Sequence, residues 1–203
     1  MNRFILAIIT LFATTVSYAQ SNINDLIAAR AQQKVKQMTD YVAYMADKEK
    51  PEEDRKEYRI LALNLFIGHG EPYIVNGASR EGVYMEITSK YRRRPTHRLM
   101  KDYFNGLINM RYSKVVIESS DIADIKVSEL KKVADHEYEC TCTFVQAFCG
   151  YRDGKPIYKD ITKKRVTCRI IEEETVKVTT SGDIETEYEY VVLLGDVEAL
   201  ETT

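Results

Sequence analysis

The chain has 203 residues, of which 44% are hydrophobic, and its 29 basic and 31 acidic residues give a formal net charge of −2. Neither sign of charge dominates, which excludes a general attraction to nucleic acid or to anionic lipid. The length is typical of one domain with a sizeable core. No motif in the sequence indicates a cofactor, and we expect none.

The first twenty residues, MNRFILAIITLFATTVSYAQ, have the pattern of a secretory signal peptide. Arg3 supplies the positive charge, Phe4 to Val16 are mostly apolar, and Ser17-Tyr18-Ala19 offers small residues for cleavage. The apolar run is shorter than the roughly 20 residues that a membrane-spanning helix needs. We therefore expect a signal peptide at 1–19, a single mature domain at 20–203 without a transmembrane segment, and a periplasmic or secreted bacterial protein.

Two amphipathic helices come next and predict a helical hairpin. Between Asn24 and Asp47, apolar residues recur every three or four positions, at Ile27, Ala31, Val35, Met38, Val42 and Met45. Pro51 and the three acidic residues after it favour a second helix start, because acidic groups stabilise the positive end of a helix dipole. Gly68 is expected to end that helix.

The middle of the chain predicts a short hairpin and a third helix. Tyr73–Val75 and Val83–Ile87 flank Asn76-Gly77, a favourable turn sequence. Thr96 is a suitable cap for the helix that follows. The apolar stripe of this helix consists of Leu99, Met100, Tyr103, Phe104, Leu107 and Ile108.

From Lys114 onward, apolar and polar residues alternate with a period of two, which indicates strands. Turn sequences at Asp153-Gly154 and Ser181-Gly182-Asp183 suggest that the later strands are antiparallel neighbours. The predicted strands are Val115–Glu118, Ile122–Val127, His136–Gly150, Pro156–Ile171 and Ile184–Leu194. Helices packed against one antiparallel sheet make an α+β domain.

This order of elements, from the first helix to Leu194, resembles the nuclear transport factor 2-like fold. In that fold a curved antiparallel sheet is wrapped by a helical hairpin and a third helix into a cone. The stretches LALNLFIGHGEPYIVNG and VQAFCGYRDGKPIYKD are similar to small exported bacterial proteins of unassigned function. The resemblance implies architecture alone, because the fold hosts isomerases, dehydratases, transport factors and assembly modules. No catalytic Asp, Tyr or His of those enzymes matches a position here.

Three cysteines, Cys140, Cys142 and Cys168, are expected to face the core. A two-residue Asp153-Gly154 turn would place the two apolar faces on opposite sides, so a three-residue loop or a bulge is needed. Cys140 then lies opposite Cys168, or Cys142 does after one more bulge. Free core thiols are the favoured interpretation, and a disulfide is the alternative that an oxidising compartment permits. A metal site with His136 lacks a second ligand pair, so we expect no metal.

Gln146 lies between Phe144 and Phe148 on an apolar face, where an unpaired amide would be costly. Either it makes a structural hydrogen bond, or it is the polar group of a ligand cavity. If the sheet curls as the resemblance implies, several aromatic residues converge around it under the third helix. The expected lining is Tyr103, Tyr138, Phe144, Gln146, Phe148, Tyr188 and Tyr190, which suits a small, weakly polar ligand.

Two groups of cationic or titratable residues are weaker candidates. Arg92, Arg93, Arg94 and His97 would suit an anion or an anionic partner, yet in a slightly acidic chain a solvated loop is the favoured interpretation. His69, between two glycines, is read as an exposed turn residue without an identifiable acid–base partner.

The first functional hypothesis is a non-enzymatic envelope protein that binds a partner protein or a small, weakly polar ligand in the sheet concavity. No catalytic residue is assigned, because no nucleophile–base pair, carboxylate pair or metal constellation is recognisable. The alternative is an isomerase or dehydratase-type enzyme with a pocket Tyr or carboxylate in proton transfer. A third hypothesis is a structural subunit that forms homo-oligomers through its sheet. A closed pocket with an ionisable group would favour the enzyme.

Overall fold

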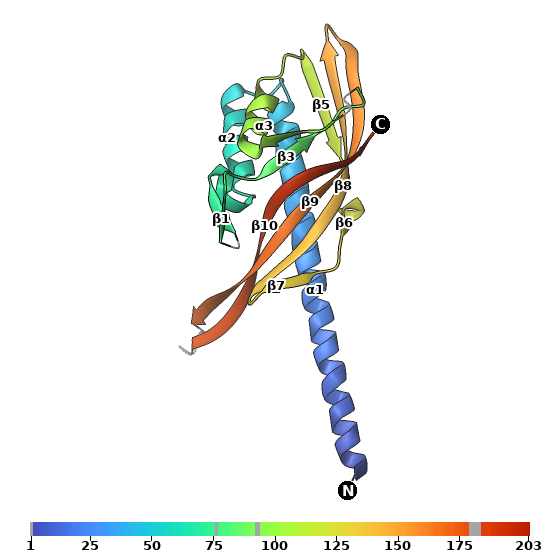
Figure 1. Cartoon of the computed structure of the whole chain (residues 1–203), viewed down its shortest axis with the longest axis vertical. Helices are drawn as coiled ribbons and strands as arrows, with labels where there is room; N and C mark the ends of the chain where they lie inside the picture. The colour runs from blue at the N-terminus through green and yellow to red at the C-terminus, as the bar shows by residue number, and fades with distance from the viewer. Residues whose placement is uncertain (1, 76, 92–93, 179–183) are drawn as a thin grey trace.

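The computed structural model describes residues 2–75, 77–91, 94–178 and 184–203, with side chains from residue 23 onward except those of 178 and 185. Within these residues the chain forms three α-helices packed on a large sheet, so the predicted α+β class is confirmed (Figure 1). The helices are α1 (Asn2–Ala46), α2 (Glu52–Leu63) and α3 (Met100–Ile108). Among them, no helix is both long enough and apolar enough to cross a bilayer.

The predicted helical hairpin is present. The stripe of α1 from Ile27 to Met45 is buried and packs against α2, α3 and the inner face of the sheet. Pro51 occupies the N-cap of α2, and acidic residues fill its first turn as expected. This helix ends at Leu63, earlier than predicted, and a 3₁₀ turn, Ile67–Gly70, follows it.

The main sheet has eight strands, and the order along its path is β4-β3-β10-β9-β8-β5, with β6 and β7 pairing with β8. All neighbours are antiparallel except β3 and β10, which pair in parallel. The strands are β1 (Tyr73–Val75), β2 (Ala78–Arg80), β3 (Tyr84–Ile87), β4 (Thr96–Leu99), β5 (Lys114–Ser119), β6 (Lys126–Val127), β7 (Lys131–Ala134), β8 (Glu137–Arg152), β9 (Lys155–Val178) and β10 (Ile184–Thr202).

Several local predictions were wrong. The segment Tyr73–Val75 pairs with β2 in a separate two-stranded sheet, because β3 pairs instead with β4 and β10. Thr96 lies in β4, and Leu99 occupies the N-cap position of α3. The strand expected at Ile122–Val127 is a 3₁₀ turn, Ile122–Asp124, followed by the two residues of β6. Strand β7 was not predicted.

The connection between β8 and β9 sets the register of the inner face. Asp153 and Gly154 both have positive φ, 50° and 75°, which is the geometry of a tight two-residue hairpin turn. A bulge between Gly150 and Tyr151 corrects the parity, as one of the two predicted solutions requires. Cys140 therefore lies directly opposite Cys168.

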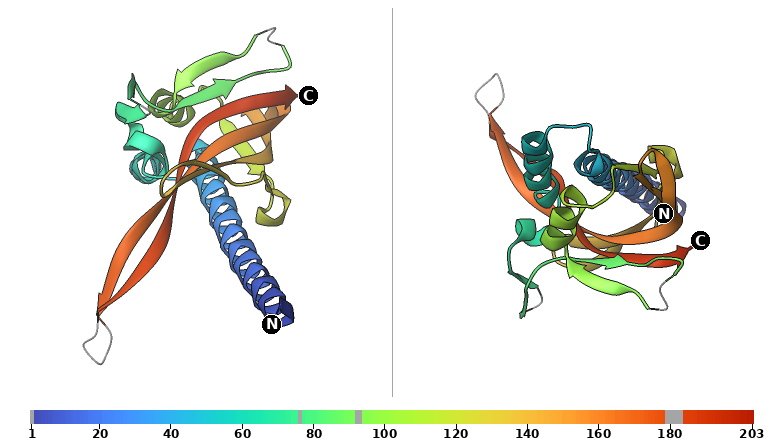
Figure 2. Two further views of the ribbon diagram at one scale, coloured as in Figure 1. Left: turned by 60° about the horizontal axis from the view of Figure 1, so that its bottom comes forward. Right: turned by 90° about the horizontal axis from the view of Figure 1, so that it is seen from above.

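Beyond Glu172, β9 loses its neighbour β8, and residues 173–178 pair only with residues 184–189 of β10 among the described strands. These residues form a two-stranded ribbon that extends away from the helices (Figures 1 and 2). At the other end of the sheet, β8, β9 and the end of β10 curve, and the β3–β4 hairpin continues the sheet beside β10 (Figure 2). This second end contains the main cavity.

Candidate functional site

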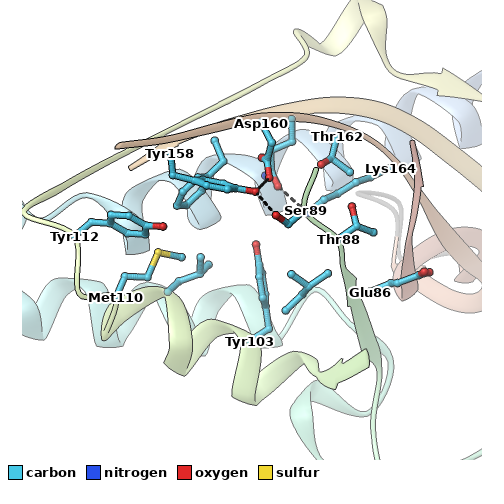
Figure 3. A pocket seen from close by; sticks show the side chains of 14 residues that line it. Glu86, Thr88, Ser89, Tyr103, Met110, Tyr112, Tyr158, Asp160, Thr162 and Lys164 are labelled. Atoms are coloured by element: carbon cyan, nitrogen blue, oxygen red, sulfur yellow. Dashed lines mark hydrogen bonds between the residues drawn. The ribbon is translucent and has the colours of Figure 1, made fainter. Parts of the chain in front are cut away.

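A cavity of about 360 Å³ lies between the inner face of β8 and β9, helix α3 and the segment that leaves β3. Its size lies within the range of small-molecule sites. Figure 3 shows Tyr103 rising from α3 toward polar side chains of β9 on the opposite wall. The lining comprises Glu86, Ile87, Thr88, Ser89, Tyr103, Leu107, Met110, Tyr112, Gln146, Phe148, Tyr158, Asp160, Thr162 and Lys164.

Strand alternation places the polar wall. Side chains two residues apart share one face of a strand, so the inner face that carries Cys168 and Val166 continues toward the start of β9 as Lys164, Thr162, Asp160 and Tyr158. Lys164, Thr162 and Asp160 are all buried. Directly opposite on β8, Phe144 pairs with Lys164, Gln146 with Thr162 and Phe148 with Asp160. The polar side chains of β9 form a polar stripe, which thus lies beside Phe144, Gln146 and Phe148 on one face of the strand pair.

One end of the polar stripe is a hydrogen-bonded group around Tyr158. The Tyr158 hydroxyl donates to Asp160 Oδ2, and its oxygen lies 2.8 Å from Ser89 Oγ. Burial, together with the hydrogen bond to Asp160, raises the pKa of Tyr158 to about 12. The hydroxyl therefore stays protonated at neutral pH, where it can donate a hydrogen bond or act as a weak acid.

The other end is the amine of Lys164. Its Nζ donates to Gln146 Oε1 at 2.8 Å, lies 3.8 Å from Met85 Sδ, and sits 5.8 Å from the centre of the Tyr103 ring. Burial lowers the pKa of Lys164 to about 8, although the negative charge of Asp160 opposes this shift. Burial also raises the pKa of Tyr103. The cavity thus contains an amine, a carboxylate and two phenols.

Aromatic rings form the remaining wall. The rings of Tyr112 and Phe148 lie 5.7 Å apart between centroids, and the same separation joins Phe148 to Tyr158. Gly150 allows Tyr112 to pack onto β8, because a Cβ at this position would lie 2.5 Å from a Tyr112 ring carbon. Apolar rings and a few polar groups around one cavity suit a ligand with a flat apolar body and a few acceptor or donor atoms.

Three of the seven residues predicted to line a pocket do so: Tyr103, Gln146 and Phe148. Gln146 makes structural hydrogen bonds with Lys164 and Ser119, and it also lines the cavity. Phe144, only 2% exposed, belongs to the hydrophobic core beside the cavity.

The expected convergence of Tyr138, Tyr188 and Tyr190 on Tyr103 is wrong. In the antiparallel β9–β10 pair, Tyr188 and Tyr190 lie opposite Glu174 and Glu172, far along β9 from Asp160. Tyr190 packs edge-on against Tyr138 and donates to Glu172, while Tyr188 stacks on His136 and is more than half exposed. The other end of β10 lies near the cavity instead, since Thr202 pairs with Thr162.

The predicted positive patch is only partly visible. Arg92 and Arg93 lie outside the described residues, as does the turn 181–183. Arg94 and His97 are exposed, and His97 Nε2 lies 4.0 Å from Glu86 Oε2 on β3. His69, with a φ of 53°, occupies the 3₁₀ turn after α2, away from the cavity lining.

The inward cysteines form a compact group of free thiols. Cys140, Cys142 and Cys168 are all buried, and Cys142 Sγ lies 3.7 Å from Cys168 Sγ. All three sulfur atoms lie within 4.8 Å of one another, and among the described residues this is the one group of ligand atoms that a metal ion could share. Structural zinc takes four ligands, so three thiols alone do not complete such a site.

The residues that sequence reasoning missed are Tyr158, Asp160, Thr162 and Lys164. The signal was available, because the alternation used for Val166, Cys168 and Ile170 continues through them toward the Asp153-Gly154 turn. Lys164 and Asp160 are expected to face solvent in spite of that alternation, because charged side chains are seldom buried. Their burial depends on α3 and the β3–β4 hairpin covering this end of the sheet.

No protein-family model matches the sequence, and no curated protein matches it either. Among solved structures, the chain is similar to a protein from Novosphingobium aromaticivorans described as "Putative Scytalone Dehydratase". The TM-score is 0.39 at 11% sequence identity, with 90% of each chain covered. A similarity at this level does not indicate the function of this chain. We infer that function from the cavity.

Proposed function

We propose that this chain is an exported protein that binds a small, weakly polar ligand in the cavity between β8, β9 and α3. The carrying observation is the cavity's mixed lining, in which the rings of Tyr103, Tyr112 and Phe148 and the polar side chains of β9 border the same space. Aromatic walls favour a planar apolar body, and a few buried polar groups fix its orientation.

The polar stripe supports an uncharged ligand with an acceptor oxygen. The positive charge of Lys164 and the negative charge of Asp160 lie on the same wall, so a strongly charged ligand would be repelled by one of them. A carbonyl or hydroxyl oxygen, by contrast, can accept from the Lys164 amine or from a tyrosine hydroxyl.

The outer face of the sheet supports ligand binding over assembly through the sheet. It carries charged residues such as Arg165, which forms an ion pair with Glu198 across β9 and β10, beside the exposed apolar side chains of Val145 and Ile161. Stable subunit interfaces have apolar centres, and a charged sheet face suits contact with water. Homo-oligomers through the sheet and a protein partner remain predictions.

The test uses benzyl alcohol and related uncharged aromatic fragments as probes, with binding followed by saturation-transfer NMR. Tyr103→Ala should weaken benzyl alcohol binding about tenfold, the loss expected when a ring contact of about 1–2 kcal/mol is removed. Tyr188→Ala is the matched control, because Tyr188 is exposed at the far end of β10. Equal loss in both variants, or no effect of Tyr103→Ala, would contradict the proposal.

A second candidate function is proton transfer of the isomerase or dehydratase kind. The specific observation that favours it is the presence of Asp160, Tyr158 and Lys164 in one buried cavity, where acid–base groups are expected in such enzymes. Exchange of the α-protons of a bound ketone for deuterium, lost in Asp160→Asn, would support this function. If the α-protons of the ketone exchange no faster with the protein than in buffer alone, proton transfer to or from that ketone is excluded.

The nuclear transport factor 2-like cone and the export signal belong to the same proposal. The element order and the curved sheet that carries the cavity support the cone. The residue pattern of positions 1–19 supports export, and the N-terminus of the mature protein tests it.

A further inference from the structure

Lys164 has an unusual position for a lysine. Its side chain points inward from β9 and is only 7% exposed, opposite Phe144 and beside the hydrophobic core. Lysines are seldom buried in this way, since the ammonium loses its hydration there. The same side chain lines the cavity, so a ligand in the cavity can reach it.

The contacts of the amine compensate its charge only weakly. They are one amide oxygen, from Gln146, one thioether sulfur, from Met85, and the face of the Tyr103 ring. None of these three described partners is anionic. The negative charge of Asp160 acts on the amine without a direct hydrogen bond between them. An amine held by neutral partners in a buried site is more easily deprotonated than one that is paired with a carboxylate.

The consequence is a larger neutral fraction. A lysine with a pKa of about 8 is neutral in roughly a tenth of the molecules at pH 7, roughly three hundredfold more than a lysine with a pKa of 10.5. The neutral amine has a free electron pair and is a nucleophile, and burial in an apolar pocket is one of the ways proteins activate lysine for attack on carbonyl groups.

We propose that Lys164 captures a small aldehyde or ketone in this cavity as a reversible imine. This inference rests on the proposed ligand-binding function and assigns the class of its ligand. The aromatic walls would hold the body of the carbonyl compound, and the carbonyl carbon would face the amine. Gln146, which accepts a hydrogen bond from Nζ, acts as a positioning residue.

The step needs no oxidant or reductant. The nitrogen electron pair attacks the carbonyl carbon, a C–N bond forms, and the carbonyl oxygen gains a proton while the nitrogen loses one. The resulting hydroxyl then takes up a proton and leaves as water, the nitrogen loses its remaining proton, and a C=N bond forms. Overall, one amine and one carbonyl compound give one imine and one water. Tyr158 and Asp160 provide proton-exchanging groups within the same cavity.

The experiment treats the full-length protein with benzaldehyde and sodium cyanoborohydride, which reduces an imine to a stable secondary amine. Peptide mass spectrometry then measures the labelled fraction of each lysine. Lys155 at the exposed β8–β9 turn is the internal reference. We expect Lys164 to be labelled at least about tenfold faster than Lys155 at pH 7, because of its larger neutral fraction. The rate should level off above about pH 8 for Lys164 alone.

Two variants control for folding and for pocket binding. Lys164→Met keeps an unbranched apolar side chain of similar reach and should abolish the fast labelling. Benzyl alcohol binding should weaken but persist, because the aromatic walls remain while the amine that donates to the alcohol oxygen is lost. Gln146→Met should shift the pH profile of Lys164 labelling without removing it, which a purely structural role of Gln146 would not do. Labelling of Lys164 no faster than that of Lys155 overturns the inference.

The outcomes separate the inference from the function on which it rests. Benzyl alcohol binding without fast Lys164 labelling leaves the binding site standing and overturns imine formation. Absence of benzyl alcohol and benzaldehyde binding, together with absence of fast labelling, overturns both. Fast labelling that Tyr103→Ala slows supports both.

Discussion

Lys164 connects the cavity to the stability of the whole chain. Its pKa is about 8 when folded and about 10.5 when unfolded, so the unfolded chain holds more protons between these values. The free energy of unfolding should therefore rise with pH in that window, by at most roughly 3 kcal/mol, and the gain is absent below about pH 8. The tyrosines with raised pKa act in the opposite direction above about pH 10.

Lys164→Met separates these effects. The variant should be more stable than the parent below pH 8, because it removes a buried charge, and the difference should shrink toward pH 10. Urea unfolding of both proteins from pH 6 to 10 measures this, and the tyrosine contributions cancel in the comparison. Parallel stability curves for the two proteins would show that Lys164 is solvated as an ordinary lysine.

The three inward thiols make a second prediction at the residue scale. Cys140, Cys142 and Cys168 are at most 3% exposed, so they should resist thiol reagents until the protein unfolds. Cys142→Ser should lower the free energy of unfolding by about 1–3 kcal/mol, because it buries a poorly paired hydroxyl. Alkylation rates and urea unfolding measure the two effects. Fast alkylation of the native protein, or zinc that survives dialysis, would contradict the core assignment.

At the scale of one element, β8 depends on the absence of a side chain at Gly150. Gly150→Ala should force the Tyr112 ring away from its place in the cavity wall. We expect a loss of stability of about 1–3 kcal/mol from overpacking, and weaker benzyl alcohol binding. Gly106→Ala in α3 is the control, since its Cβ would meet only the end of Arg98 at 3.6 Å. Similar effects of the two substitutions would contradict this role of Gly150.

How much of an element can be predicted depends on what covers it. The stripe of α1 and the inward face at Cys140, Cys142 and Cys168 follow from periodicity alone, because the burial of apolar side chains sets them. Asp160 and Lys164 obey the same alternation, yet their charged side chains predict that they face solvent. Their burial depends on α3 and the β3–β4 hairpin, which cover this end of the sheet. These contacts join residues far apart in the sequence, so no local sequence pattern predicts them.

The failed placement of Tyr188 and Tyr190 has a different origin. Alternation correctly gives the face of a strand, whereas the position along a strand as long as β10, with its 19 residues, depends on the register with its neighbours. The Asp153-Gly154 turn limits the β8–β9 register to a few alternatives from sequence, and the bulge between Gly150 and Tyr151 selects one of them. For β10, the predicted turn at Ser181-Gly182-Asp183 already implies that its first residues, including Tyr188 and Tyr190, lie beside the end of β9 and far from the start of β9.

At the scale of the whole molecule, the N-terminal segment carries a prediction about processing. The pattern of positions 1–19 implies cleavage after Ala19, so the mature protein should begin at Gln20. Intact-mass spectrometry of the native protein from its own cell fractions measures this. Met1 to Ala19 retained on a cytoplasmic protein would contradict export and would also remove the oxidising compartment that a disulfide needs.

The ribbon formed by residues 173–178 and 184–189 has a consequence for how the molecule opens. Its backbone hydrogen bonds lack cover from a third strand or from a helix among the described elements, so local fraying there costs little. In hydrogen–deuterium exchange, its amides should exchange well before those of residues 162–170, which β8 and β10 flank on both sides. Its unpaired edges are also templates for adding a strand, and charged residues such as Glu173 and Lys177 oppose such growth. Slow exchange of the ribbon in the native protein would therefore indicate that another chain covers it.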